Sequence, residues 1–294
     1  MTTLSQCQLC PHRCMKRPGF CGAGIQTRVF RWGPHFGEEP PITGQKGSGC
    51  VFFSRCTMKC AYCQNSPWSW CGEGEDKTVE QLRSIFRDLA IKDGVENWNL
   101  VSPTPYLPFI EEAIKPLLDE GVRLPFVWNS SGYERVETLE KYSFLCDCAL
   151  FDLRYADDKT AQKYSKVNNY VNSARQAVKW AFETRQGVGD LPGLIVRILV
   201  LPGHAEEAVR NLEWIASELS PLVSVSVMAQ YTPSYKALEI SPLNRVVTHE
   251  EYELVADAAA DLGFENGWVQ GYEAADEALA LLGKNMQPGH GTVK

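Results

Sequence analysis

Three of the eleven cysteines in this chain have a spacing suited to iron–sulfur chemistry. Cys56, Cys60 and Cys63 form a C-x3-C-x2-C motif directly after the apolar run 51–53. A compact loop with this spacing can turn three thiolates towards one point, and thiolates are the usual ligands of a [4Fe–4S] cluster. Because such a cluster normally takes four ligands, three protein ligands leave one iron open. The main alternative is zinc, but a structural zinc site requires four ligands in a closed shell.

Four further cysteines lie near the N-terminus, at positions 7, 10, 14 and 21. Cys7, Cys10, Cys14 and Cys21 form C-x2-C-x3-C-x6-C in a segment too short to fold around a core of its own. The spacing predicts one metal site. A second [4Fe–4S] cluster would relay electrons or hold substrate, whereas tetrahedral zinc would be structural. We favour iron–sulfur, because the chain must already be made under cluster-loading conditions.

The other four cysteines carry no assigned chemistry. Buried free cysteine is a common small core residue, so we expect Cys50, Cys146 and Cys148 to be packing residues. Cys71 lies eight residues after Cys63 in a Trp- and Gly-rich segment. We interpret it as an isolated loop thiol.

The composition agrees with a folded, acidic, cytoplasmic enzyme. The 294 residues include 29 Lys and Arg and 36 Asp and Glu, a net charge of −7, and 44% are hydrophobic. This excludes disorder and argues against a nucleic-acid or anionic-membrane binder, which would need a basic face. No apolar stretch is long enough to span a bilayer, and no signal peptide is evident at the N-terminus. In the cytoplasm thiols stay reduced, so clustered cysteines indicate metal ligands rather than disulfides.

Apolar runs alternate with amphipathic segments from residue 48 onward. This alternation predicts βαβ units with a parallel sheet, and six units favour a partial (β/α)6 barrel over a full eight-fold barrel or a doubly wound sheet. We expect a metal-bound irregular segment over 1–47, the barrel over 48–270, and a helix and tail over 271–294. The predicted strands are 50–53, 98–101, 125–129, 148–153, 194–201 and 223–228. The predicted helices are 78–93, 108–120, 135–142, 158–185, 206–219 and 249–262.

Polar residues follow the predicted strands, and in parallel sheets the active site lies at the carboxyl ends of the strands. Arg197, inside the barrel, needs a partner such as a bound carboxylate or ribose, and Gln230 could bind adenine. Asp152 and Arg154 could grip a carboxylate or form a structural ion pair. The candidate cofactor-binding residues are Tyr62, Ser102, Thr104, Asn129, Asp152, Arg154, Arg197 and Gln230. Tyr62 has packing as its alternative, and His35, Glu38 and Glu39 are either structural or solvated residues or acid–base groups.

The cysteine loop and several other stretches resemble the radical S-adenosylmethionine superfamily. Within it the chain is similar to the pyruvate formate-lyase-activating-enzyme-like branch with a cysteine-rich N-terminus. The matching stretches are CQLCPHRC (7–14), EEPPITG (38–44), GSG (47–49), LVSPT (100–104), NSSGY (129–133), DLRY (152–155), RILVLPG (197–203) and MAQYTP (228–233). Two positions depart from better-known activating enzymes. Ser102-Pro103-Thr104 stands where those enzymes have Gly-Gly-Glu at the amino group of S-adenosylmethionine, and Arg154 replaces a lysine.

The resemblance implies that the open iron binds S-adenosylmethionine. One electron from the cluster would cleave it, and the 5′-deoxyadenosyl radical would abstract hydrogen from substrate. The substrate could be a polypeptide, as for glycyl-radical activases, or a small molecule; a non-catalytic iron–sulfur or zinc protein is the third hypothesis. Flavodoxin or ferredoxin is the expected electron donor, although the acidic composition indicates no evident patch for it. Exposed low-potential clusters predict an anaerobic setting.

Overall fold

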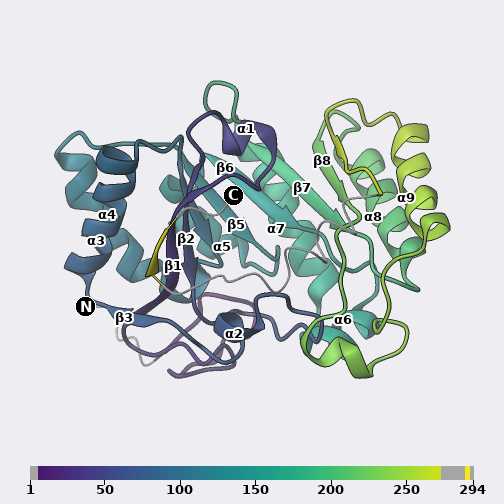
Figure 1. Ribbon diagram of the computed structural model, residues 1–294, viewed down its shortest axis with the longest axis horizontal. Coiled ribbons are helices and arrows are strands. Elements are labelled where there is room, and N and C mark those ends of the chain that lie inside the picture. The colour runs from purple at the N-terminus through teal and green to yellow at the C-terminus, as the bar shows by residue number, and fades with distance from the viewer. Residues whose placement is uncertain (1–5, 273–288, 292–294) are drawn as a thin grey trace.

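The computed structural model describes residues 6–272 and 289–291, and its centre is one mostly parallel sheet with helices on its outer face (Figure 1). In this part of the chain the ten strands follow the order β10-β1-β2-β4-β5-β6-β7-β8-β9, with β3 paired to β1. The strands are β1 (Thr27–His35), β2 (Ser48–Phe53), β3 (Glu75–Lys77), β4 (Trp98–Val101), β5 (Phe126–Ser130), β6 (Cys148–Asp152), β7 (Leu194–Leu199), β8 (Ser224–Met228), β9 (Gly267–Val269) and β10 (Gly289–His290). The described sheet is not closed, since β10 and β9 lie at its two ends. The predicted partial barrel is confirmed.

All six strands predicted from the apolar runs form, and each is parallel to its neighbour among the six. They are β2, β4, β5, β6, β7 and β8. Strands β2 and β6 show why the runs are continuous: every residue of β2 is buried, as are the first four of β6. A strand covered by side chains on both faces has no solvent-facing positions at which polar residues would alternate.

The described part contains nine α-helices. They are α1 (Pro40–Thr43), α2 (Ser66–Ser69), α3 (Val79–Asp88), α4 (Leu107–Asp119), α5 (Val136–Lys141), α6 (Asp158–Ser165), α7 (Tyr170–Thr184), α8 (Ala205–Glu218) and α9 (His249–Asp261). Helices α3 to α9 lie in the crossovers between parallel strands. Helices α3 and α9 begin with capping boxes, in which Thr78 and Thr248 satisfy the first free amides. Every helix in the described part is too short or too polar to span a lipid bilayer.

The single helix predicted over 158–185 is wrong, because the chain divides it into α6 and α7. Lys166 ends α6 with a left-handed backbone (φ 57°), and Asn169 precedes α7 with φ 53°. Asparagine tolerates this conformation better than most residues. The break matters for the site, since the last residues of α6 contact the cysteine loop.

Part of the N-terminal segment is regular, contrary to the prediction of an irregular 1–47. Strand β1 pairs antiparallel with β2 and therefore extends the sheet. Residues 6–26 carry no helix or strand. The boundary at 47/48 remains a prediction, and most of the predicted C-terminal segment 271–294 lies outside the described residues.

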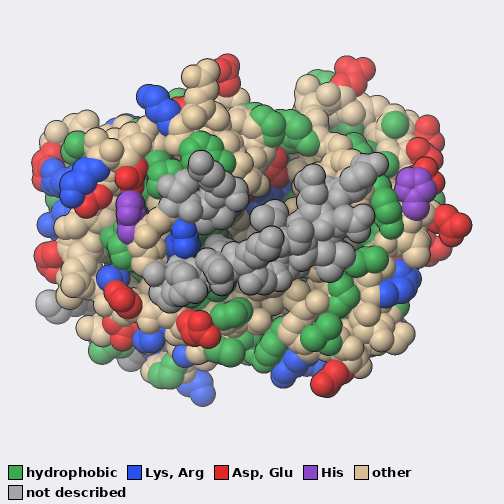
Figure 2. Space-filling model, viewed as in Figure 1, with side chains coloured by type: hydrophobic (Ala, Val, Ile, Leu, Met, Phe, Trp, Pro, Cys, Tyr) green, Lys and Arg blue, Asp and Glu red, His purple; other side chains and the backbone are tan. Residues whose placement is uncertain are grey.

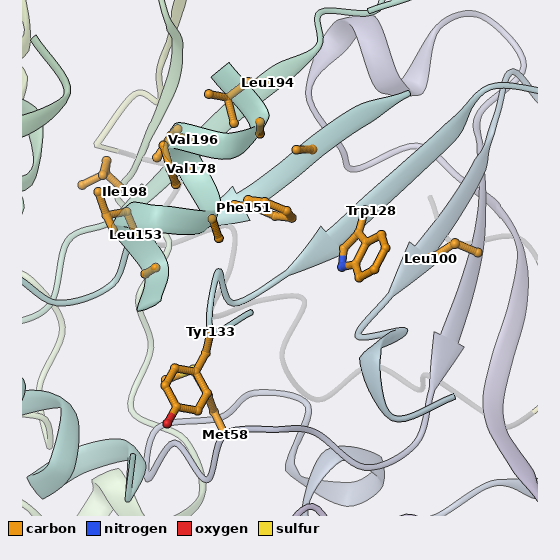
Figure 3. Packing of buried hydrophobic residues seen from close by; sticks show 14 of the residues in the cluster. Met58, Leu100, Trp128, Tyr133, Phe151, Leu153, Val178, Leu194, Val196 and Ile198 are labelled. Atoms are coloured by element: carbon orange, nitrogen blue, oxygen red, sulfur yellow. The ribbon is translucent and has the colours of Figure 1, made fainter. Parts of the chain in front are cut away.

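The core reaches the cysteine loop through Met58. Met58 is 2% exposed and belongs to the main buried cluster together with Tyr133, Trp128 and Phe151. Figure 3 shows Met58 and Tyr133 close together beyond the ends of the strands. A methionine fixed in the core anchors the middle of the loop that carries Cys56 and Cys60.

Candidate functional site

The cysteine loop begins where β2 ends and is fixed by backbone hydrogen bonds to α6. Lys59 N donates to Ser165 O at 3.0 Å, and Ala61 N donates to Tyr164 O at 2.7 Å. Before the loop, Arg55 has φ 73°, which turns the chain sharply after the strand. The loop is therefore held at the carboxyl end of the sheet from two sides.

Each cysteine sulfur of the loop has a hydrogen-bond partner. Cys60 Sγ accepts from Ser165 Oγ at 3.0 Å and from Arg154 Nη1 at 3.4 Å. The amide of Met58 approaches Cys56 Sγ at 3.5 Å, and Ser69 Oγ lies 3.1 Å from Cys63 Sγ. Such donors stabilise thiolate ligands.

Burial and repulsion from neighbouring sulfurs favour the neutral thiol form of Cys56 and Cys63. Burial, followed by the charge of Cys60, raises the pKa of Cys63 to about 12 and also raises that of Cys56. Cys60 contributes to the shift at both Cys56 and Cys63, as expected for three thiols on one short loop. Bound iron would supply the positive charge that such a group requires, so the residues fit a cluster.

The site geometry does not resemble that of a single-ion centre. Within 6–272 and 289–291, no group of three or more His, Cys, Asp or Glu side chains is arranged around one metal ion. In a [4Fe–4S] cluster each thiolate binds a different iron, so the three sulfurs do not need to meet at one point.

Arg154 connects the end of β6 to the cysteine loop. Its Nε and Nη2 bind Asp152 Oδ2 at 3.0 and 2.5 Å, while Nη1 points to Cys60 Sγ. The structural ion pair considered from the sequence is therefore present. Tyr62 is buried, and its hydroxyl lies 2.7 Å from that of Tyr155, which in turn is 2.6 Å from Ser165 Oγ. Tyr62 thus supports the loop from behind.

A small polar recess lies beside Cys56, between the ends of β4 and β5. Glu134 is the charged residue among those that line it, and its side chain is buried. Glu134 Oε1 accepts from Thr104 Oγ1 at 2.6 Å, while Oε2 has no hydrogen-bond partner. The lining residues are Cys56, Thr57, Ser102, Thr104, Pro105, Ser130, Ser131 and Glu134.

The Glu134 carboxyl group has an unusually high proton affinity. Burial raises its pKa from 4.5 to about 7, against the opposing hydrogen bond from Thr104. Ser130 and the Trp128 indole also oppose the increase, but neither meets hydrogen-bond geometry at Oε2. No arginine or lysine contributes to the shift.

Arg197 and Asn129 belong to a different network in the interior of the barrel. Arg197 binds Glu39 through Nε at 2.7 Å and Nη2 at 2.6 Å, and it also pairs with Glu38. Asn129 Nδ2 donates to Glu38 Oε1 at 3.4 Å, as Asn99 does at 3.1 Å. Two glutamates thus supply the partner that we expected a bound carboxylate or ribose to provide.

This interior network lies at the other end of the sheet. Glu38 and Glu39 directly precede α1, which lies at the end of the strands opposite α2 and the cysteine loop (Figure 1). Although burial alone would raise it, the Arg197 guanidinium keeps the pKa of Glu38 below its ordinary value. His35 is partly buried nearby, and burial lowers its pKa. These groups stabilise the fold of the N-terminal segment against the barrel.

Gln230 lies at the end of β8, close to the last cysteine of the loop. Its backbone oxygen accepts from Gln64 Nε2 at 3.2 Å, and Gln64 follows Cys63 directly. Its side chain faces Met228 Sδ at 3.4 Å and Gln270. The structure therefore brings Gln230 to the same edge as the cysteine loop, across from Ser102 and Thr104.

The four N-terminal cysteines lie near one another and near the first site. Burial, and then the charges of other groups including Cys21 and Cys7, raises the pKa of Cys10. Amides of Phe20 and Ala23 approach Cys14 Sγ and Cys21 Sγ at 3.3 and 3.4 Å. This donor set fits a thiolate-bound metal or cluster. Cys50, Cys146 and Cys148 are buried and Cys71 is exposed, in agreement with their interpretation as packing residues and a loop thiol.

The mostly parallel open sheet with a three-cysteine loop at its carboxyl edge defines a class of iron–sulfur enzyme. The model of the radical SAM superfamily matches residues 50–215, more than half of the chain. An uncharacterized protein from Methanocaldococcus jannaschii is 30% identical over 271 residues, which cover 86% of this chain and 74% of that protein. The chain belongs to the radical SAM superfamily.

Solved structures show weaker likenesses. SuiB from Streptococcus suis bound to S-adenosylmethionine has 14% identity and a TM-score of 0.49, with 81% of this chain and 56% of that chain covered. SuiB bound to its precursor peptide SuiA has the same identity and TM-score, and there this chain spans 49% of SuiB. A domain of pyruvate-formate lyase-activating enzyme from Bacteroides vulgatus has 17% identity and a TM-score of 0.41, over 56% of this chain and 92% of that domain.

Two site residues escaped the sequence reasoning. Glu134 follows the NSSGY stretch directly, and a charged residue just after a buried strand end was the signal that could have revealed it. Ser165 carries no such signal. It reaches Cys60 only because α6 ends there, a position that the break between α6 and α7 determines.

Proposed function

We propose that the chain is a radical S-adenosylmethionine enzyme that binds a [4Fe–4S] cluster through Cys56, Cys60 and Cys63. When bound, the cluster supplies the electron that cleaves S-adenosylmethionine to methionine and a 5′-deoxyadenosyl radical, which abstracts hydrogen from substrate. The observation that carries the proposal is the group of three neighbouring cysteines at the carboxyl edge of the sheet, one buried and two half-buried, in a chain of this superfamily.

The residues around the loop have separate roles in this proposal. Ser165 and Arg154 donate to Cys60 Sγ, which stabilises negative charge at that ligand and favours a reduced cluster. Glu134, in the recess beside Cys56, would accept a hydrogen bond from the amino group of S-adenosylmethionine through Oε2. It would thereby replace the Gly-Gly-Glu that this chain lacks after β4. Ser102 and Thr104 would line the same recess, Gln230 would approach the cofactor from the opposite edge, and Tyr62 would hold the cysteine loop from behind.

The test is formation of 5′-deoxyadenosine by the anaerobically reconstituted, dithionite-reduced protein. Cys56→Ala, Cys60→Ala and Cys63→Ala should each abolish it, because one missing ligand exposes a second iron. Cys71→Ala is the matched control: it removes an exposed thiol from the following loop and should leave the product unchanged. No product from the well-reconstituted wild type would refute the proposal and favour a non-catalytic iron–sulfur or zinc protein.

We propose a polypeptide substrate, as the resemblance to glycyl-radical activases suggests, with a small molecule as the alternative. A glycyl-radical protein encoded beside this chain would be the first candidate. The expected result is a glycine-centred radical in its electron paramagnetic resonance spectrum after incubation with the reduced enzyme. Turnover of a small molecule that depends on S-adenosylmethionine, with no glycine-centred radical on any protein, would favour the alternative.

We propose that the N-terminal cysteines hold a second metal centre, either iron–sulfur or zinc. Metal analysis of the purified protein distinguishes the two. About four additional irons per chain, lost in Cys10→Ala, indicate a second [4Fe–4S] cluster. One zinc indicates a structural site.

A further inference from the structure

A cavity of about 340 Å³ lies between the N-terminal segment and the helical layer, separate from the recess beside Cys56. Its walls come from residues 6–9 and Arg17 on one side, and from α4 and the stretch 135–142 that contains α5 on the other. The cavity and the recess share no lining residue. Small-molecule sites have volumes of roughly 300–1,000 Å³. The cavity is therefore large enough for a ligand other than the cofactor of the cysteine loop.

Cations dominate the charge of this cavity. Arg17, Arg135 and Lys141 line it, and Glu137 is the acidic residue among its described walls. Glu137 Oε1 lies 3.3 Å from Arg135 Nη2 and is shared with Arg13, whose Nη2 is 3.8 Å away. The Nε–H group of Arg135 is buried and has no hydrogen-bond partner. One carboxylate offsets at most one of the three cations, so the walls keep an excess of two positive charges.

Arg17 and Lys141 carry this excess, since neither forms an ion pair with a carboxylate in the described part of the chain. Arg17 donates through Nη1 to Gly24 O at 2.8 Å and through Nη2 to Pro105 O at 2.6 Å, and both acceptors are neutral. Its Nε–H group is buried without a partner. Lys141 Nζ lies over the ring of Tyr142, 4.9 Å from its centre. A half-buried guanidinium is normally compensated by an anion.

The rest of the molecule shows no general excess of basic groups that would explain this cavity. The chain has a net charge of −7. Acidic side chains gather over α9 in Figure 2, where Glu250 and Glu253 are exposed. The exposed Lys92, in the turn after α3, is paired with Asp88 at 2.8 Å. The uncompensated cations are therefore a local feature of the cavity.

The composition of the walls indicates the chemistry of the ligand. A phosphate monoester carries about −1.5 to −2 charges at pH 7, which matches the excess, whereas a carboxylate carries one. Guanidinium and ammonium groups are the usual phosphate binders in proteins. Leu9, Pro108 and the buried Tyr142 supply apolar surface in the same walls. This surface suits an organic group attached to the phosphate.

We propose that this cavity binds a small molecule that carries a phosphate monoester. Arg17 and Lys141 would hold the phosphate, and the organic part would lie against the apolar side of the walls. The bound molecule would connect the N-terminal segment to α5. The site goes beyond the proposed function, because neither S-adenosylmethionine nor a reductant takes part in binding.

The probe is phenyl phosphate, which joins a phosphate monoester to an aromatic ring. Calorimetric titration of the reconstituted, unreduced protein at a fixed chloride concentration measures its Kd. Benzoate and phenol are titrated in the same way, as the carboxylate and the neutral ring. We expect phenyl phosphate to bind more tightly than either. Absence of measurable binding of phenyl phosphate, or equally tight binding of benzoate or phenol, would overturn the phosphate site.

Substitution of Lys141 tests the location. Lys141→Gln should raise the Kd of phenyl phosphate about fivefold, because one of the two uncompensated charges is lost. Lys141→Arg keeps the charge and should bind with nearly the wild-type Kd. The control Lys92→Gln removes a lysine that is 71% exposed on another part of the surface and should change nothing. Equal Kd values for Lys141→Gln and Lys92→Gln would place the binding elsewhere and overturn the proposal.

Substitution of the acidic residue gives a test of opposite sign. Glu137→Gln should lower the Kd about threefold, because it removes the negative charge of the walls and releases Arg135. Glu140→Gln removes an exposed carboxylate from the same helix, away from the cavity lining, and is the control. Weaker binding by Glu137→Gln, or an equal gain in both variants, would contradict the site. A protein that forms no 5′-deoxyadenosine but shows these changes would lose the proposed function and keep the phosphate site.

Discussion

Replacement of Glu134 by glutamine should move stability and cofactor affinity in opposite directions. Burial raises the pKa of Glu134 from 4.5 to about 7, and at about 1.4 kcal/mol per tenfold change in proton affinity the ionised form costs the apoprotein about 3 kcal/mol. Because the folded-state pKa lies above the unfolded one, this cost is absent below pH 4.5 and grows as the pH approaches 7. Glutamine keeps an acceptor for Thr104 and removes the charge.

We therefore expect Glu134→Gln to stabilise the apoprotein at pH 8 by up to about 3 kcal/mol and to change little at pH 4.5. Anaerobic urea denaturation at the two pH values measures this difference. Equal or lower stability of the variant at pH 8 would show that the carboxylate is not a buried charge without a cation.

The same substitution should weaken S-adenosylmethionine binding. A hydrogen bond from the amino group of the cofactor to the charged Glu134 carboxylate contributes about 1.5–3 kcal/mol, so Kd should rise roughly 10- to 100-fold at pH 8. Calorimetric titration of the reconstituted, unreduced protein measures binding without cleavage. Glu140→Gln, an exposed change of the same chemistry, is the control. An unchanged Kd in Glu134→Gln would refute the role assigned to this residue.

Two further substitutions test the second cysteine site and the acid stability of the fold. In Gly19→Ala the new Cβ would lie 2.7 Å from Cys14 Sγ, so the second site should lose its metal while the three-cysteine cluster is retained. The control is Gly24→Ala, whose Cβ meets nothing within 4 Å and which should lose neither metal. Metal analysis of both purified variants measures the difference. Hydrogen bonding to Arg245 lowers the pKa of Glu251 to about 2. This pair should contribute stability above pH 4.5 that is lost as the pH falls towards 2, and after solvent screening Glu251→Gln should cost about 1 kcal/mol at pH 7 by urea denaturation.

The central strands could be predicted from the sequence because burial on both faces requires continuous apolar runs. In β2 and β6 continuous apolar runs end in polar residues, and the cysteine motif follows one such end. Strand β1 has no such continuous apolar run. It mixes Arg28, Arg31, Gly33 and Pro34 with apolar residues, and it is held by pairing with β2 rather than by a repeating pattern.

The site was predictable only where its residues are close in sequence. Cys56, Cys60 and Cys63 lie within eight positions, and their spacing alone identified them. The partners of Arg197 could not be found this way, because Glu38 and Glu39 are about 160 positions away and meet it only inside the folded barrel. A buried arginine signalled that a partner was needed, but not which one.

The partners of the buried acids distinguish Glu134 from the others in the described interior. In the described interior, Glu38 and Glu39 share the single cation Arg197, Asp152 pairs with Arg154, and Glu207 faces His204. Glu134 has no such cation, although an ionised carboxylate buried without a partner is costly. Under the proposed function, Oε2 of Glu134 would gain a hydrogen-bond donor from the amino group of S-adenosylmethionine, next to the proposed cluster ligand Cys56.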